Sequence, residues 1–339
     1  MEEYLHLFQT EAEFDLERQN NYSEPWVSYI ESIDRVDYNK TEEEKMLETP
    51  FTIEALGSGE LYWDLAGNQL EYSKNGGPWT PTSYIYVQLV EGDEFAFKGV
   101  NTEYNFQVPI NCTASFNVKG NIMSLVYGDD FKTASTLTVD SQFGGLFSGS
   151  ETIVSAGGLR LPATTLTEYC YSYMFYDCIN LTTAPALPAT TLTDYCYDEM
   201  FFGCRNLTSA PALPATTLTD YCYYWMFQGC TSLTSAPALP ATTLANSCYH
   251  SMFYGCTGLT SAPELPALTL VTSCYDNMFN SCSNLNYIKC LATDISANDC
   301  TNVWVGGVSG SGTFVKNPSM SSSSWGTGDS GIPTGWTIQ

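Results

Sequence analysis

The chain has 339 residues and carries 37 acidic against 12 basic side chains, which gives a formal net charge of −25. A surface with that charge repels nucleic acid and anionic membranes, so we expect neither as a partner. Charged residues make up only 14% of the chain and aromatic residues another 14%, which is typical of β-rich or solenoid proteins and not of disordered ones.

Residues 1–47 are polar and strongly acidic, and their one aromatic cluster reads EPWVSYI. We interpret this segment as an arm that docks the protein to its assembly, with Trp26 and Tyr29 as docking residues. It has no basic start and no unbroken apolar run, so we expect no secretory signal and a chain that folds in a cytoplasm. No stretch of the sequence is long and apolar enough to predict membrane insertion.

Residues 48–122 hold short strand-like runs such as FTIEAL, ELYWDL and YIYVQL, separated by turn residues at 75–77 and 92–93. Runs of this kind predict a small antiparallel β-sandwich. Residues 123–160 are expected to form a connector and the N-terminal cap of the domain that follows.

From residue 161 the sequence repeats itself every 26 residues. A leucine frame with a period of about 20–30 residues predicts a leucine-rich-repeat solenoid, whose units bury their apolar faces only by stacking. We therefore expect such a solenoid over residues 161–300 and a divergent C-terminal cap over 301–339, in a β-rich α/β protein. Two sets of residues keep the register: Leu161, Leu187, Leu213, Leu239, Leu265 and Leu291, and Cys170, Cys196, Cys222, Cys248, Cys274 and Cys300.

The sequence pattern within each unit predicts a short strand followed by a short helix. The strand, as at Leu207–Ala210, should end at the proline that follows, because proline cannot donate to a ladder. A helix is expected at Asp194–Phe202, with Gly203 ending it. Positions that are the same in every unit should face the core, and positions that vary should face outward. The representative core residues are Leu207, Leu213, Leu218, Met226 and Phe227.

The varying positions carry many aromatic residues, and a grouped set of exposed rings marks a binding surface. Three interpretations stay open: another subunit or domain covers the rings, they bind a glycan or another external ligand, or their exposure has no function. We expect a homo-oligomer, with a trimer as its form. The predicted interaction surface consists of Tyr169, Tyr173, Tyr176, Tyr195, Phe202, Tyr221, Tyr224, Trp225 and Tyr254.

Most of the 13 cysteines follow the repeat, in pairs eight residues apart such as Cys170 and Cys178. Because the number is odd and no secretory signal is expected, buried reduced thiols are the favoured interpretation. Disulfides between neighbouring coils are an alternative. A ladder of metal sites is disfavoured, because zinc sites use more closely spaced pairs. No cofactor and no metal site is predicted.

No catalytic motif is found. His250 occupies a varying position without a nucleophile beside it, and we expect it to be surface decoration. Asp198 and Glu199 are neighbours on the predicted helix, where we expect a solvated face. A carbohydrate-active enzyme would need a convergent acid pair in a cleft, so the sequence does not predict an enzyme.

The order Leu-Pro…Cys-Tyr-x-x-Met-Phe-x-x-Cys-x-x-Leu resembles the BspA-like leucine-rich repeats over about residues 137–305, with a longer unit and Met where Ala is typical. The acidic arm, the strand-rich region, the NIMSLVYGDDF segment and the GTFVKNP…GIPTGW tail together resemble virion appendage proteins of Bacteroidales phages, including crAss-like phages. That resemblance implies a non-enzymatic head or tail fibre or decoration subunit, in contact with other virion proteins. The alternative is a bacterial cell-surface adhesin of the BspA type, which would require export.

Overall fold

A computed structural model describes residues 40–106, 108–320 and 325–339, and divides the chain into two units, Met1–Lys45 and Met46–Gln339. The predicted docking residues Trp26 and Tyr29 lie outside the described residues. Helix α4 (Glu42–Glu48) begins at a capping box, in which the Glu44 amide donates to Thr41 Oγ1 and the Thr41 amide donates to Glu44 Oε2.

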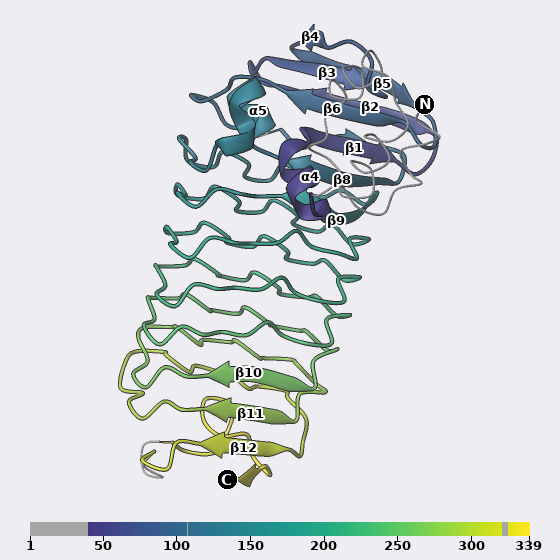
Figure 1. Cartoon of the computed structure of the whole chain (residues 1–339). Helices are drawn as coiled ribbons and strands as arrows, with labels where there is room; N and C mark the ends of the chain where they lie inside the picture. Colours follow the sequence, from purple (N-terminus) through teal and green to yellow (C-terminus); the bar gives the residue numbers. More distant parts are fainter. Residues whose placement is uncertain (1–39, 107, 321–324) are drawn as a thin grey trace, which may run out of the picture. The chain divides into compact units, whose positions relative to one another are not determined.

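Two sheets lie at the N-terminal end of the second unit (Figure 1). The larger has the strand order β4 (Thr80–Thr82), β3 (Leu70–Lys74), β6 (Glu94–Lys98), β1 (Phe51–Ala55), β8 (Phe116–Asn121), β9 (Ile153–Arg160). The smaller has the order β5 (Tyr84–Leu89), β2 (Gly59–Asp64), β7 (Asn111–Cys112). The sheets meet at Trp63 and Phe97, which are buried with ring centroids 6.0 Å apart. Alternate strand residues thus form a shared core, as the periodicity predicts.

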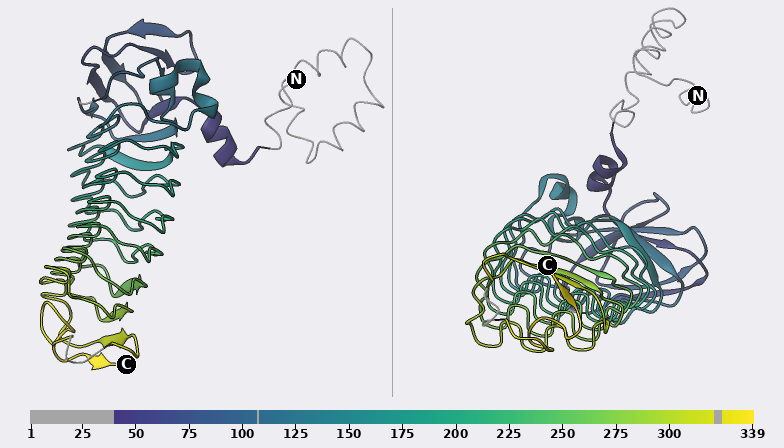
Figure 2. Two further views of the ribbon diagram at one scale, coloured as in Figure 1. Left: turned by 90° about the vertical axis from the view of Figure 1, so that its left-hand side faces the viewer. Right: turned by 90° about the horizontal axis from the view of Figure 1, so that it is seen from below.

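Strand β9 joins the larger sheet to a stack of coils. It pairs in parallel with β8, and its residues Ser155 and Arg160 bridge to Thr183 and Ala186 of the next coil. Helix α5 (Ser124–Tyr127) and a 3₁₀ helix (Gly128–Thr133) precede it. Figure 2 shows the coils from the side and along the stack. The β-rich architecture with few helices is confirmed, and the domain boundaries stay a prediction.

One side of the stack carries parallel strands, which are regular only near its C-terminal end: β10 (Ser261–Leu265), β11 (Tyr287–Cys290), β12 (Thr313–Lys316) and β13 (Thr337–Ile338). Earlier coils make isolated bridges instead, such as Ser209 to Ser235. The expectation that each strand ends at its first proline is wrong for β10, which contains Pro263. The register shifts between Ser261 and Glu264, and such an irregularity accommodates a residue without an N–H.

The predicted helix at Asp194–Phe202 is wrong, because this segment is a run of consecutive turns. The Asp198 N–H donates within the coil to the carbonyl of Tyr195 (3.2 Å), whereas the Tyr197 N–H donates to Cys222 of the next coil (3.1 Å). This alternation continues along the segment, so half of its amides bond to the neighbouring coil, as in a parallel ladder. In an α-helix each of those amides would donate to the carbonyl four residues earlier in the same segment.

Left-handed backbone conformations recur at every fourth residue of the turn run. Tyr195, Glu199 and Gly203 have φ values of 57°, 51° and 71°, and the equivalent positions of the other coils behave alike. The inward side chains consequently repeat every four residues, close to the helical period of 3.6. That similarity explains why the sequence pattern indicates a helix and still identifies the inward positions correctly.

The predicted core is confirmed. Leu207, Met226 and Phe227 are fully buried, and Leu213 and Leu218 are 3% and 5% exposed. Equivalent rings stack from coil to coil: Phe201 on Phe227 at 5.6 Å and Tyr197 on Tyr223 at 5.9 Å between centroids.

All thirteen cysteines are buried free thiols. The thiol of Cys230 donates to the carbonyl of Phe201 in the preceding coil, with 3.1 Å between sulfur and oxygen. Cys178, Cys204, Cys256 and Cys282 make the same contact with the equivalent carbonyls. Burial raises the pKa of Cys178 to about 12, which keeps its thiol protonated. These five cysteines therefore behave as small core residues, each with one hydrogen bond to the preceding coil.

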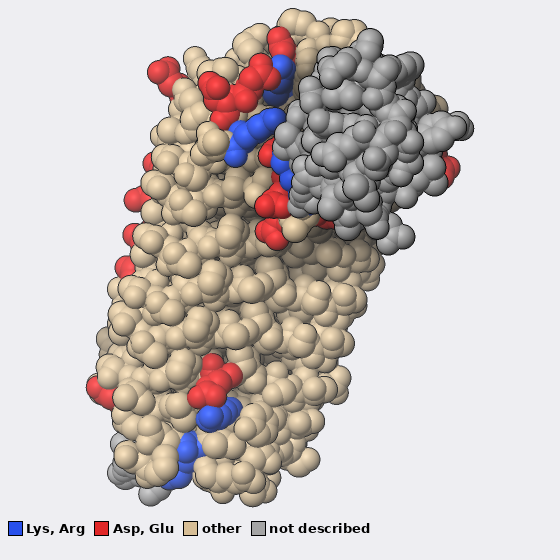
Figure 3. Space-filling view, viewed as in Figure 1, with Lys and Arg blue, Asp and Glu red and all other residues tan. Residues whose placement is uncertain are grey.

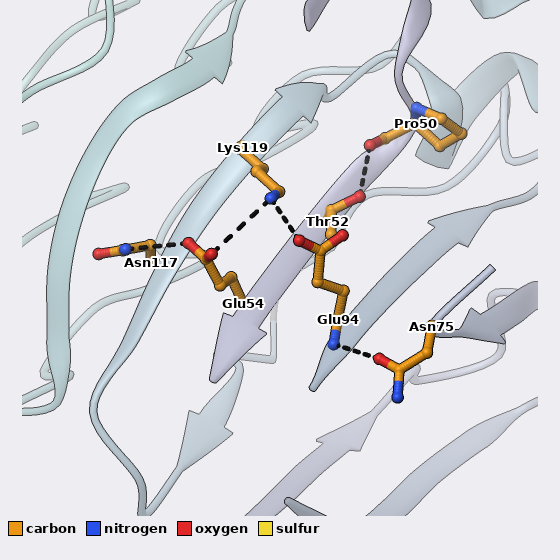
Figure 4. A network of polar contacts seen from close by, with 7 residues as sticks. All are labelled: Pro50, Thr52, Glu54, Asn75, Glu94, Asn117 and Lys119. Atoms are coloured by element: carbon orange, nitrogen blue, oxygen red, sulfur yellow. Dashed lines mark hydrogen bonds and ion pairs between the residues drawn. The ribbon is translucent and has the colours of Figure 1, made fainter. Parts of the chain in front are cut away.

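Charge is distributed unevenly. On the face that carries β10 to β12, charged side chains gather towards the two ends, and over the middle coils they are seen only along the left margin (Figure 3). In the larger sheet, Glu54 and Glu94 oppose each other on neighbouring strands, which would be repulsive. Lys119 of β8 relieves this, with its Nζ 2.7 Å from Glu94 Oε1 and 3.9 Å from Glu54 Oε1 (Figure 4).

Candidate interaction surface

The turn runs place one column of tyrosines on the outer side of the coils. We call this outer side, over residues 167–178, 193–204, 219–230 and 245–256, the turn face. Tyr169, Tyr195 and Tyr221 lie above one another because they are 26 residues apart. Their centroids are 4.5 and 4.6 Å apart, with planes 15° and 4° from parallel.

A second group of rings lies beside this column. Tyr176 stacks on Phe202 at 4.7 Å, and Phe202 contacts Trp225 at 6.1 Å. Trp225 in turn stacks on Tyr224 at 4.9 Å between centroids.

The contact of Tyr221 with Tyr224, at 5.5 Å between centroids, joins the column to this second group. Tyr173 adds to the second group through its contact with Tyr176 at 5.4 Å. Eight of the nine predicted surface residues thus form one continuous aromatic patch. Tyr254 lies one coil further on and shares no ring contact with the patch among the described residues. Tyr173 is 40% exposed, and the other eight are half-buried.

The expectation of a solvated acidic face at Asp198 and Glu199 is wrong. Asp198 and Glu199 are each only 6% exposed. The Ser172 hydroxyl donates to Asp198 Oδ2 at 3.3 Å, and the Tyr173 hydroxyl donates to Glu199 Oε1 at 2.5 Å. Asp198 Oδ1 is buried and has no hydrogen-bond partner within the described part of the chain.

Burial controls the protonation of these carboxyls. It raises the pKa of Asp198 to about 7, with the neighbouring Glu199 adding to the effect and the Ser172 hydroxyl opposing it. Burial also raises the pKa of Glu199, against the hydrogen bond from Tyr173. Burial thus favours the protonated form of both carboxyls.

His250 is more than surface decoration. Its ring stacks on Tyr224 at 4.7 Å, and its Nδ1 lies 3.6 Å from Asp276 Oδ2 in the next coil. Burial lowers the pKa of His250, which Asp276 opposes, and burial raises the pKa of Asp276, which His250 opposes. The sequence analysis missed this pair, and the 26-residue spacing was the signal that could have found it.

The described ranges offer no second arrangement of this kind for a metal ion or a membrane span. Within them, no three His, Cys, Asp or Glu side chains are arranged to hold a metal ion. None of the helices described there is both long enough and apolar enough to cross a membrane. The aromatic patch with its two carboxyls is the arrangement best suited to binding.

Comparison with known proteins identifies the repeat. Residues 158–238 and 197–301 match the model of the BspA type leucine rich repeat region, in six copies. No curated protein and no solved structure matches the chain. The matched segment coincides with the stacked coils and contains the whole aromatic patch. The protein therefore carries a region of BspA-type leucine-rich repeats, a non-catalytic architecture for binding or adhesion.

Proposed function

We propose that this protein is a non-catalytic binding protein that attaches to another macromolecule or to a particle surface through the turn face. The observation that carries the proposal is the continuous patch of eight aromatic rings, contributed by three successive coils. Backbone hydrogen bonds between coils hold these rings in place, so little side-chain freedom is lost on binding. Aromatic side chains on a rigid support are the groups that anchor interfaces.

The more specific proposal is a phage virion subunit, such as a head or tail fibre or decoration protein, made in the host cytoplasm. Residues 1–47 and the strand-rich region after them would attach it to other virion proteins, as a trimer, and the repeats would contact subunits or the host surface. The support is the resemblance of the flanking regions to virion appendages. The BspA-type repeats support a bacterial cell-surface adhesin equally well.

Replacement of Trp225 by alanine tests the binding role. Trp225 contacts two rings of the patch, Phe202 and Tyr224, and also His250, so we expect attachment to the parent particle or cell to fall at least about tenfold. Tyr254→Ala removes a half-buried ring from the same side outside the patch, and should change attachment less than about twofold. Equal effects of the two variants, with both proteins folded by circular dichroism, would contradict the proposal.

Mass spectrometry separates the two specific proposals. A virion subunit should be found in purified particles at a fixed copy number, and a chain lacking residues 1–47 should fold but fail to incorporate. An adhesin should instead be found in the surface fraction of bacterial cells. Full incorporation of the shortened chain would contradict the docking role of the arm.

A further inference from the structure

Stacking between coils covers the flat faces of the rings in the aromatic patch. Tyr195 has a tyrosine on each side, at 4.5 and 4.6 Å. Phe202 is stacked on Tyr176 on one side, and on the other side Trp225 lies 6.1 Å away with its plane tilted by 42°. A sugar ring binds an aromatic residue by laying its C–H groups on a free ring face, and stacked rings present mainly edges. The patch is therefore poorly suited to a glycan.

The charge of the turn face argues against a second copy of the chain. Residues 161–307 contain ten acidic and only two basic side chains, Arg205 and Lys289. Lys289 is engaged on the strand side, where its Nζ lies 2.8 Å from Glu264 Oε2. Arg205 follows the end of its turn run. Two turn faces brought together would oppose like charges, whereas a basic partner would be attracted.

Asp198 and Glu199 are the one pair of adjacent acidic residues on the turn face. The repeat places Glu199 between Tyr173 of the preceding coil and Trp225 of the following one, and the Glu199 amide donates to the Tyr224 carbonyl at 2.8 Å. Asp198 Oδ1 is an acceptor that is buried without a hydrogen-bond partner in the described chain. An ionised carboxyl that is buried without a cation is costly, and a cation placed beside it favours the ionised form.

We propose that the turn face binds a basic segment of a partner protein, and that an arginine or lysine side chain of that segment pairs with Glu199 and Asp198 between Tyr173 and Trp225. This inference rests on the binding role proposed above and adds the class of partner. A guanidinium or ammonium group would be attracted both by the carboxyls and by the surrounding π systems. It would supply the counter-charge that these carboxyls lack in the free protein.

A tetra-arginine peptide amide is a suitable probe, titrated into the full chain at physiological salt and followed by calorimetry. The double variant Asp198→Asn/Glu199→Gln should bind it at least about tenfold more weakly than the wild type. The matched control is Glu91→Gln/Glu103→Gln, which removes the same two charges from exposed positions. It should weaken binding less than about twofold. Thermal unfolding of both variants verifies that they fold.

Several results would overturn the inference. Equal weakening in the two double variants would mean that the peptide senses only net charge, and no saturable binding to the wild type would mean that the site is absent. Dissociation of a self-associated form by Asp198→Asn/Glu199→Gln, measured by ultracentrifugation, would favour a second copy. If Trp225→Ala loses attachment and the carboxyl variant keeps it, the binding role stands and the basic partner is wrong. Full attachment of Trp225→Ala would remove the binding role itself.

Discussion

Replacing Asp198 by asparagine should stabilise the protein at pH 8 and have little effect at pH 4. In the folded chain, burial raises the pKa of this carboxyl from 3.8 to about 7. Between these values the unfolded chain has lost the proton while the folded chain keeps it. The unfolded state then binds fewer protons, so the wild type loses stability as the pH rises through this window and no more above it.

The size of the effect follows from the pKa shift. A shift of about three units corresponds to about 4 kcal/mol, and Asp198 is buried enough that solvent screening takes little from it. Asparagine has no proton to lose, so the free energy of unfolding of the variant, relative to the wild type, should rise by up to about 4 kcal/mol between pH 4 and pH 8. For a chain of 339 residues this corresponds to roughly 6 °C in thermal unfolding.

Urea and thermal unfolding of both proteins at pH 4, 6 and 8, followed by circular dichroism, measure this difference. Asp294→Asn is the control, since hydrogen bonds from the Ser296 side chain and amide lower the pKa of that exposed carboxyl. It should show no gain in stability at high pH. Parallel pH profiles for the wild type and Asp198→Asn would show that Asp198 is ionised and solvated in the folded state, and would refute the reasoning.

Three further substitutions examine the scaffold. Met226→Ala opens a cavity between coils and should cost about 2–5 kcal/mol in thermal or urea unfolding, with amide exchange increasing in the adjoining coils as well. Cys230→Ser should cost about 1–3 kcal/mol, because a hydroxyl replaces a buried thiol, and neither reductant nor chelator should affect the wild type. Gly203→Ala should destabilise the protein more than Gly255→Ala in the same assays. Both glycines have positive φ, so both substitutions strain the backbone, but only at Gly203 would the new methyl group also collide with the Asp177 side chain.

The core could be predicted because the repeat units can be aligned with one another, which shows the positions that stay constant. A position such as Met226 holds the same residue in five units, and only the interior imposes such uniformity. The local backbone could not be predicted in the same way. Inward positions spaced by four residues fit a helix nearly as well as a run of turns, and only the hydrogen bonds to the next coil decide between them. Those partners are 25 residues away and leave no local pattern.

The burial of Asp198 was missed for the same reason. On a helix surface, a residue is judged by its neighbours three and four positions away. In the stacked coils its neighbours are Ser172 and Tyr224, which are 26 positions away in each direction. The exposed fraction of a varying residue therefore depends on the column to which it belongs, and the two carboxyls are enclosed by the large rings of their own and adjoining columns.

This column organisation explains how a uniform scaffold can carry a specific binding surface. Every second amide of a turn run donates to a backbone carbonyl of the next coil whatever its side chain is, so the outward side chains can differ while these bonds are kept. One column accordingly holds Ser172, Asp198, Tyr224, His250 and Asp276 at equivalent positions. Charge and aromatic surface then change along the stack in steps of one coil. A partner that contacts three coils meets a combination of side chains that no other part of the repeat presents, and the aromatic patch with its buried carboxyls is one such combination.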